Sequence, residues 1–298
     1  MKDSPAISST TLPRPASLSS QAAAENFPVA SRLLPKEYRR HLIALYGFAR
    51  LVDDLGDELP GSPEDRLAAL DAAEAELDRA FGEDSPPTHP VFVRLAATIK
   101  ERSLPRRPFA DLIEANRLDQ RVFHYETFDG LLGYCRLSAN PVGRLVLAIF
   151  GQETPEHVAM SDDICTALQL VEHLQDVAED AARGRCYLPR EDLRDFGVPM
   201  GPDGELVARS PVSPALRRLV AFETSRASSL FTAGAPLVAS LKGWARVAVA
   251  GFLGGGLAQA EALRRAGYDV ISHSAKASPA SVVVQSAGAF VRPARGRR

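Results

Sequence analysis

Apolar residues recur every three or four positions along most of this chain, and almost none of it alternates with the two-residue period of a β-strand. Between Leu42 and Val52, the large apolar side chains fall on one broad face of a helix. The only run of three β-branched residues, Val282–Val284, lies near the C-terminus. Because helices with broad apolar faces must bury them against one another, the sequence predicts an all-α bundle.

Turn residues divide this pattern into helical segments. Ser62 is expected to cap a helix that begins at Pro63. Further helices are expected over 91–102, about 108–124, about 127–135, about 140–150, 155 to about 182, 212–232 and 234–266. Glycines at 251 and 254–256 interrupt the last of these, and each costs a helix about 1 kcal/mol relative to alanine. The pattern indicates eight or more helices.

Composition excludes several classes of protein. Apolar residues make up 45% of the 298 and charged residues 24%, as in globular domains rather than disordered or membrane-embedded chains. A net charge of −2 gives no general field for nucleic acid, so no nucleic-acid partner is expected. No apolar run reaches the ~18–20 residues of a membrane-spanning helix. Three cysteines are too few for a disulfide framework here. A cytoplasmic location is expected, with peripheral contact at the inner membrane face left open.

The two ends of the chain differ from its body. Residues 1–24 are rich in Ser, Ala and Pro and are expected to be disordered. The last 29 residues contain five basic and no acidic residues, so 273–298 are expected to form a disordered basic tail. This tail either holds the protein near anionic lipid or only adds solubility. Residues 25–272 then form the folded domain.

Carboxylates are concentrated in two places on helices that otherwise read as core. In the first, Asp53 and Asp57 are four residues apart and project from one helix face. In the second, Glu172, Asp176 and Asp180 form one row with i, i+4, i+8 spacing among apolar residues. The carboxylates in such a row repel one another unless cations neutralise them. Mg²⁺ is the ion that proteins commonly bind through carboxylates and substrate phosphates at the same time. Two rows facing a cavity predict a Mg²⁺–diphosphate clamp.

Two other interpretations compete with this clamp. A single acidic run is commonly a solvated helix end, although two runs on apolar helices favour a shared site. A diiron centre requires Glu-x-x-His pairs, and no Glu in this chain has a His three residues later. Iron is therefore disfavoured.

An ordered series of blocks resembles the squalene/phytoene synthase family, the head-to-head trans-isoprenyl diphosphate synthases. The matching blocks are Asn26–Pro35, the first acidic motif, Tyr134-Cys135, Asn140–Gly143, Gln169–Asp180, Gly184–Pro189 and Gly267–Val270. They extend over about residues 25–271. Within the family, Asn26–Ser31, Ser138–Gly143 and the Gln175-Asp176 pair are most similar to the bacterial hydroxysqualene synthases of hopanoid biosynthesis.

The resemblance implies an isoprenoid synthase helical bundle around a central apolar cavity. It implies Mg²⁺-dependent conversion of presqualene diphosphate to hydroxysqualene, with release of diphosphate, capture of the cation by water and no NADPH. The implied catalytic residues are Asp53, Asp57, Asp176, Asp180 and Tyr134. The four aspartates and Glu172 would hold the metal. The implied substrate-binding residues are Asn26, Tyr46, Arg50, Gln169, Arg185 and Tyr187. Contacts with other enzymes of the pathway stay open.

The chain departs from the family pattern at two places. Glu172 stands where most members have Asn, and Ser272–Ser274 replaces an Arg usually found after Val270. Three readings of the function therefore remain: hydroxysqualene formation, a head-to-head condensation giving presqualene diphosphate, squalene or phytoene, and an inactive scaffold with the family fold.

Overall fold

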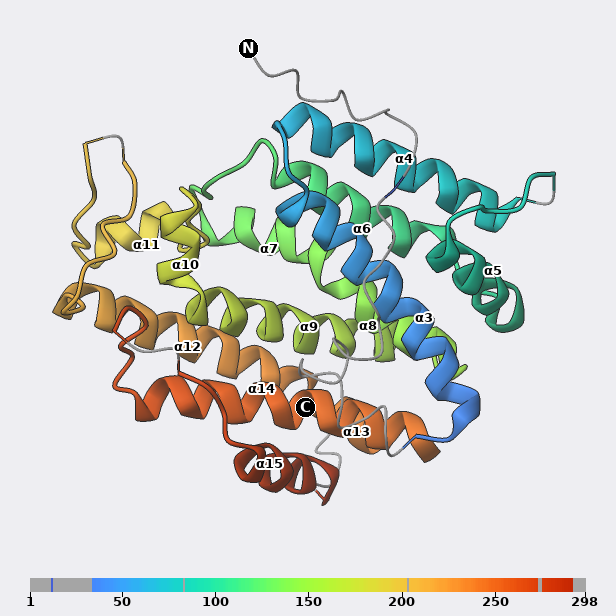
Figure 1. Cartoon of the computed structure of the whole chain (residues 1–298). Coiled ribbons are helices and arrows are strands. Elements are labelled where there is room, and N and C mark those ends of the chain that lie inside the picture. The colour runs from blue at the N-terminus through green and yellow to red at the C-terminus, as the bar shows by residue number, and fades with distance from the viewer. Residues whose placement is uncertain (1–11, 13–33, 83, 203, 273–274, 292–298) are drawn as a thin grey trace, which may run out of the picture.

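The computed structural model describes residues 12, 34–82, 84–202, 204–272 and 275–291. Within these residues the fold is all-α, which confirms the predicted class; they form no strand, and only two isolated β-bridges occur, His124–Cys186 and Met200–Leu206. Figure 1 shows the helices packed as one bundle, with α9 across its middle. None of these helices is both long and apolar enough to cross a membrane.

The described helices follow one another with short connections. They are α3 (Lys36–Asp53), the π-helical turn η1 (Asp54–Glu58), α4 (Pro63–Phe81), α5 (Pro90–Arg102), α6 (Arg106–Leu118), α7 (Phe128–Ser138), α8 (Asn140–Ile149), α9 (Pro155–Gln175), α10 (Val177–Ala182), α11 (Arg190–Asp195), α12 (Pro214–Gly234), α13 (Pro236–Ser240), α14 (Gly243–Arg265) and α15 (Pro279–Val291). The start of α4 is as predicted: Ser62 and Asp65 form a reciprocal capping box, and Pro63 is the first helical residue.

The apolar interior consists of two clusters that meet at α8. The first cluster joins α3, α4, α5 and α6, and Phe48 lies at its centre with edge-to-face contacts to Phe92 and Phe109. The second joins α7, α9, α12, α14 and neighbouring segments. In α8, Leu145 belongs to the first cluster and Leu147 to the second. Because each buried Leu or Phe contributes about 1.5–3 kcal/mol, both clusters stabilise the positions of the helices between them.

The predicted helix 155–182 is divided in two. It ends at Gln175 and resumes at Val177, since Asp176 leaves the helical conformation (φ −98°, ψ 8°). The predicted helix 234–266 is likewise divided, into α13 and α14.

Close packing explains the glycines inside α14. A Cβ on Gly254 would lie 2.4 Å from the backbone of Ser286 in α15, and a Cβ on Gly256 would lie 2.3 Å from the ring of Phe231. The glycines weaken the helix locally but allow two neighbours to approach its axis. Helix propensity alone predicts only that these glycines destabilise the helix.

The expectation of a disordered tail over 273–298 requires a correction. Residues 279–291 form α15, which packs along α14 at the Gly254–Ser286 approach. Burial of Ala289 and the lack of any charged residue in α15 provide the physical reason. Of residues 1–24, only Leu12 is described, and its side chain is buried in the first cluster.

Candidate active site

Asp53 is the last residue of α3, and α6 provides its hydrogen-bond partner. Asn116 Nδ2 donates to Asp53 Oδ1 at 3.2 Å. Gly56 permits this approach, because a Cβ there would lie 2.3 Å from the Asn116 side-chain oxygen. Gln120 Nε2 donates to the Gly56 carbonyl at 2.9 Å and fixes α6 on the same turn. A small residue inside the acidic motif therefore lets α6 support its first carboxylate.

Burial within the protein raises the pKa of Asp53 to about 7. Repulsion from Asp57 and from Glu172 on α9 acts in the same direction, and the Asn116 hydrogen bond opposes it. Solvent nevertheless reaches Asp53, so this residue does not lie in the packed interior. The repulsion from Glu172 places this carboxylate of α9 near enough to Asp53 of α3 for the two charges to interact.

The first motif continues through a π-helical turn in place of the expected α-helix. The Leu59 N–H donates to the Asp54 carbonyl at 2.9 Å, the i→i+5 bond of a π-turn. Asp57 lies in this turn and pairs with Arg185, with Nη1 2.6 Å from Oδ1. The predicted diphosphate ligand Arg50 forms ion pairs with Asp54 (2.8 Å) and Glu58 (3.0 Å). Arginines thus neutralise part of this acidic turn.

The second motif lies where α9 gives way to α10. Backbone hydrogen bonds run from the Asp176 N–H to the Glu172 carbonyl (3.1 Å) and from the Asp180 N–H to the Asp176 carbonyl (2.8 Å). The three acidic residues therefore remain one turn apart although Asp176 is not helical. Burial raises the pKa of Asp180 to about 7, with repulsion from Asp176 as the next cause, and burial also raises the pKa of Asp176.

The segment after α14 passes beside this motif. Gln175 Nε2 and Gln259 Nε2 both donate to the carbonyl of Ala275. The neighbouring Lys276 lowers the pKa of Asp176, in opposition to the effect of burial. Gln175, one of the residues that carried the subgroup resemblance, thus holds the C-terminal segment against the site.

Arg185 and Tyr187 reach the site through a sharp turn after α10. Gly184 has φ +75°, a left-handed conformation that favours glycine. The Cys186 N–H then donates to the Phe123 carbonyl at 2.8 Å, which fixes this segment beside the end of α6. Arg185 is therefore held between the first motif and α6, where its Nη2 also donates to the carbonyl of Asp119 at 3.3 Å.

Two tyrosines share one buried carboxylate. Tyr134 donates from its hydroxyl to Asp119 Oδ2 at 2.7 Å, and Tyr187 donates to Oδ1 at 2.9 Å. Burial raises the pKa of Asp119 to about 6, which the two hydroxyls and the charge of Arg185 oppose. Asp119 was not predicted from the sequence. The only feature that could have indicated it is its position directly after an amphipathic helix.

An aromatic stack surrounds these hydroxyls. The ring of His173 stacks on Tyr187, with centroids 3.8 Å apart and 9° between the planes. Tyr134 and Tyr125 pack against the same ring of Tyr187. Burial lowers the pKa of His173 to about 3, so this imidazole is neutral at physiological pH. Gln169 Nε2 lies 3.3 Å from His173 Nε2, which connects a predicted substrate residue to the stack.

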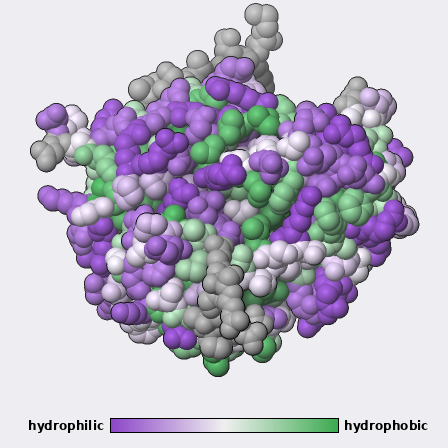
Figure 2. All heavy atoms as spheres, turned by 180° about the vertical axis from the view of Figure 1, so that it is seen from behind, coloured by the Kyte–Doolittle hydropathy of each residue, from purple (hydrophilic) through white to green (hydrophobic). Residues whose placement is uncertain are grey.

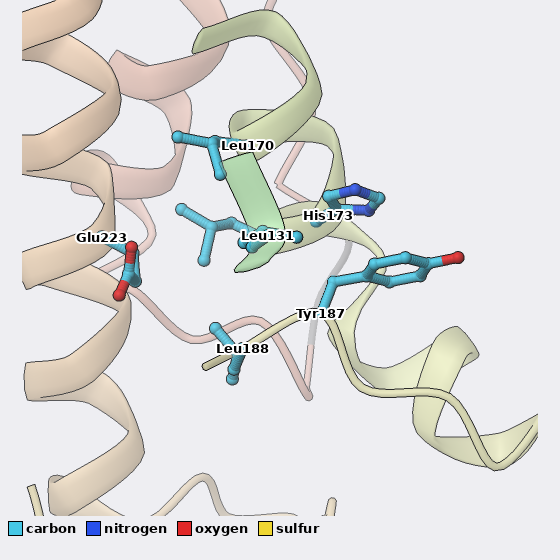
Figure 3. A pocket seen from close by; sticks show the side chains of 7 residues that line it. Leu131, Leu170, His173, Tyr187, Leu188 and Glu223 are labelled. Atoms are coloured by element: carbon cyan, nitrogen blue, oxygen red, sulfur yellow. The ribbon is translucent and has the colours of Figure 1, made fainter. Parts of the chain in front are cut away.

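A small pocket lies beside the second motif, lined by Leu131, Leu170, His173, Leu174, Tyr187, Leu188 and Glu223. Figure 3 shows Glu223 reaching it from α12, opposite His173 and Tyr187. Burial raises the pKa of Glu223 to about 8, and its Oε2 has no hydrogen-bond partner among the described residues. Its Oε1 accepts from Arg226 at 2.8 Å, and Asp192 accepts from the same Arg226 nitrogen at 2.6 Å.

The predicted metal ligands form an all-oxygen donor set with carboxyl pKa values raised by burial and mutual repulsion, which a hard divalent cation would relieve. Within the described residues, no three His, Cys, Asp or Glu side chains already lie close enough to hold one ion. Mg²⁺ commonly binds through one or two carboxylates and takes its other ligands from water and substrate phosphates. The residues therefore fit Mg²⁺ brought together with a diphosphate.

The structure brings most of the predicted site residues to one region between the two apolar clusters. Asn116 on α6 binds Asp53, and Asp119 just after α6 binds Tyr134 and Tyr187. Arg185 joins Asp57 to the Asp119 carbonyl. Glu172 on α9 lies near Asp53. Tyr46 is buried in α3, one turn before Arg50. Asn26 lies outside the described residues.

Comparison with known proteins assigns this arrangement to a family. The profile of the squalene/phytoene synthase family matches residues 20–281. A hydroxysqualene synthase of Rhodopseudomonas palustris is 38% identical over 219 residues, 73% of this chain and 72% of the relative. A phytoene synthase of Mycobacterium tuberculosis is 35% identical over 231 residues, 74% of this chain and 71% of the relative.

A solved structure shares both fold and sequence with the chain. The squalene synthase HpnC from Alicyclobacillus acidocaldarius superposes with a TM-score of 0.75 at 43% identity, covering 85% of this chain and 93% of the other. With its all-α bundle, its two opposed acidic motifs and these relatives, the chain belongs to the squalene/phytoene synthase family.

Proposed function

We propose that this enzyme converts presqualene diphosphate to hydroxysqualene in the squalene and hopanoid pathway, with Mg²⁺ and without NADPH. The observation that carries the proposal is the pair of acidic motifs that face one another across α3 and α9, with carboxyl pKa values raised by their shared surroundings. Relatives of that activity and the squalene synthase structure support the choice of reaction.

Different residues would have different roles at the site. Asp53, Asp57, Glu172, Asp176 and Asp180 would hold Mg²⁺, which as a Lewis acid stabilises a leaving diphosphate. Arg185, already between the two motifs, would exchange its bond with Asp57 for the diphosphate. The Tyr134 ring would face the carbocation and stabilise it through the π face. Apolar walls would exclude water until the final capture step.

Product analysis by gas chromatography and mass spectrometry tests the reaction. Purified protein with Mg²⁺ and no NADPH receives presqualene, farnesyl or geranylgeranyl diphosphate in parallel reactions. We expect hydroxysqualene from presqualene diphosphate alone.

A head-to-head condensation is the second candidate, because a phytoene synthase lies at nearly the same identity as the hydroxysqualene synthase. Presqualene diphosphate or phytoene formed from the linear substrates would establish that step instead. No product in any reaction would favour a scaffold role.

Substitution of the motif aspartates tests the clamp. Asp53→Asn or Asp176→Asn should lower turnover by about two or more orders of magnitude, since each removes an anionic ligand from the leaving-group site. Circular dichroism should show an unchanged helical signal. Asp195→Asn, at an exposed position on α11, is the matched control and should keep wild-type turnover. Full activity in either motif variant would exclude the two-motif clamp.

A further inference from the structure

Helix α15 presents an apolar surface outward. Four of the nine large apolar side chains that are more than a third exposed in the described residues belong to this 13-residue helix. They are Val283 (61%), Val284 (69%), Phe290 (39%) and Val291 (77%). The helix contains no charged residue. Both of its faces are thus apolar, although only one is needed to pack on the protein.

The inward face of α15 is already occupied. Ser286 lies over Gly254 and Ala289 is buried, so these positions dock the helix on α14. Val283 and Val284 lie on the other side, where no described residue covers them. α15 lies at the lower edge of the molecule in Figure 1, and hydrophobic residues are visible at the same edge in Figure 2. Large contiguous apolar surface on a protein marks a contact with a partner or a membrane.

Charge next to this surface favours an anionic partner. Directly after Val291, the sequence contains Arg292, Arg295, Arg297 and Arg298 and no acidic residue. At the same end of the helix, Arg246 lies over the ring of Phe290 and donates to its carbonyl. Trp244, two residues before Arg246, is 41% exposed. Apolar side chains with neighbouring Arg and Trp are the composition of helices that lie in a membrane interface.

The position of α15 connects this surface to the active site. The residues that lead into the helix are held by Gln175 and Gln259 through the Ala275 carbonyl. Lys276 in the same connection acts electrostatically on Asp176 of the second motif. The connection that leads into α15 therefore passes next to the acidic site, while α15 itself packs on α14.

We propose that the outward face of α15 (Val283, Val284, Phe290 and Val291) docks on the anionic surface of a lipid bilayer. The helix lies in the plane of the interface and its valines enter the acyl boundary. The four arginines in the last seven residues of the sequence favour an anionic surface. The docking itself is independent of the reaction; its use rests on the proposed function, because a triterpene product leaves water for a membrane.

Flotation of the full chain with lipid vesicles tests this surface. We expect wild-type protein to float with vesicles of phosphatidylcholine containing about 30% phosphatidylglycerol, and binding to fall in about 0.5 M salt. Val283→Asp/Val284→Asp should lower the partition coefficient at least about tenfold, since it places two charges on the face that would enter the bilayer. Val93→Asp, at a valine that is 49% exposed on α5, is the matched control and should bind as wild type. Circular dichroism and thermal unfolding verify that each variant folds.

Three outcomes would overturn the proposal. These are wild-type protein that stays unbound, an α15 double variant that floats as well as wild type, and loss of binding by the α5 control. Sedimentation velocity without lipid tests whether a second copy of the chain covers this face. If the wild-type protein is a dimer and the double variant is a monomer, the face is an oligomer interface instead. Assays of product formation in detergent solution keep failure of the reaction separate from failure of the docking.

Discussion

Burial raises the pKa values of several carboxyl groups of this protein, and three of these groups have very different partners. Asp53 accepts from an amide and faces other carboxylates, which suits a cation site. Asp119 accepts from two tyrosine hydroxyls. Glu223 shares one arginine with Asp192. The same carboxyl group thus has three different sets of partners, and each set leads to its own prediction.

Asp119→Asn should lower kcat by about tenfold or more and lower the free energy of unfolding by no more than about 3 kcal/mol. An amide offers one acceptor oxygen, so one tyrosine hydroxyl loses its bond to a charged acceptor, an interaction of about 1.5–3 kcal/mol. Tyr134 and Tyr187 would then no longer be held in fixed orientations. Steady-state kinetics of Asp119→Asn, of Tyr134→Phe and of the double variant would measure the coupling. We expect the double variant to be no slower than the slower single variant.

Tyr125→Phe provides the control for this series. Tyr125 packs against Tyr134 and Tyr187, but its hydroxyl is buried without a hydrogen-bond partner among the described residues. Its removal should leave kcat unchanged. If the effects of the Asp119 and Tyr134 substitutions instead multiply, the shared carboxylate does not orient that tyrosine.

Glu223→Gln should change how stability depends on pH. Burial and the nearby Asp192 raise the folded-state pKa of Glu223 to about 8, well above the value in an unfolded chain, while Arg226 opposes the shift. Between these two pKa values the folded state keeps a proton that the unfolded state loses. Stability therefore falls as pH rises from about 5 to 8, and this loss is absent below the unfolded pKa. The neutral glutamine removes this contribution.

Urea denaturation at pH 5, 6.5 and 8 measures the effect. The variant should gain stability relative to wild type with rising pH, by at most about 1.4 kcal/mol per unit. His173 and Tyr187 also line the pocket, but a His173 pKa of about 3 and a raised Tyr187 pKa keep both neutral in this range. A difference between variant and wild type that does not change with pH would contradict the assignment.

At the scale of elements, close helix approaches account for sequence features that carry no chemistry. A Cβ on Gly143 of α8 would lie 2.3 Å from Ser161 Oγ of α9, and Asn140 accepts from Thr166 at 2.9 Å. The family block Asn140–Gly143 is therefore a packing contact between α8 and α9. Because α9 bears Glu172, this contact sets the position of the second motif.

Gly254→Ala in α14 should displace α15. The added Cβ would meet backbone atoms of Ser286 at 2.4 Å, and backbone cannot rotate away as a side chain can. Gly255→Ala is the matched control, since nothing lies within 4 Å of its Cβ, and it should stabilise the helix by up to about 1 kcal/mol. Hydrogen exchange of the amides of residues 280–291 reports on the displacement. Equal exchange in the two variants would show that α15 does not depend on this approach.

At the scale of the whole molecule, the residues of the candidate active site come from helices of both apolar clusters. Asp53 and Asp57 belong to helices of the first cluster, and Glu172, Asp176 and Asp180 to helices next to the second. The ion pair between Asp57 and Arg185 joins the two sides directly. A ligand that bridges both motifs is then expected to stabilise the whole bundle.

Mg²⁺ and a non-hydrolysable prenyl diphosphate analogue together should raise Tm, and neither should do so to the same extent alone. A ligand at 100 times its Kd adds about 2.7 kcal/mol to the free energy of unfolding. Differential scanning fluorimetry and isothermal titration calorimetry measure the shift and the binding. EDTA should reverse it, and Asp53→Asn should abolish it. A scaffold that has lost the site would show no metal-dependent binding, which would contradict the proposed function.

Much of the fold could be predicted from helical periodicity, since apolar spacing reports directly which helix face is buried. The interruption at Asp176 and the π-turn at Asp54–Glu58 could not, because the local sequence there continues a helical pattern. The helix α15 was missed because its partner, the glycine face of α14, is distant in sequence.

By itself, the sequence determined the all-α class, the cap of α4, the family and the two acidic motifs. These depend on spacing within one helix or on short blocks, which are local properties of the chain. The tertiary structure decided that Asp119 holds two tyrosines, that Arg185 pairs with Asp57, and that an uncharged C-terminal helix packs on α14. Each of these joins segments far apart in the sequence, and burial then sets their pKa values, because desolvation depends on every neighbour that the folded chain supplies.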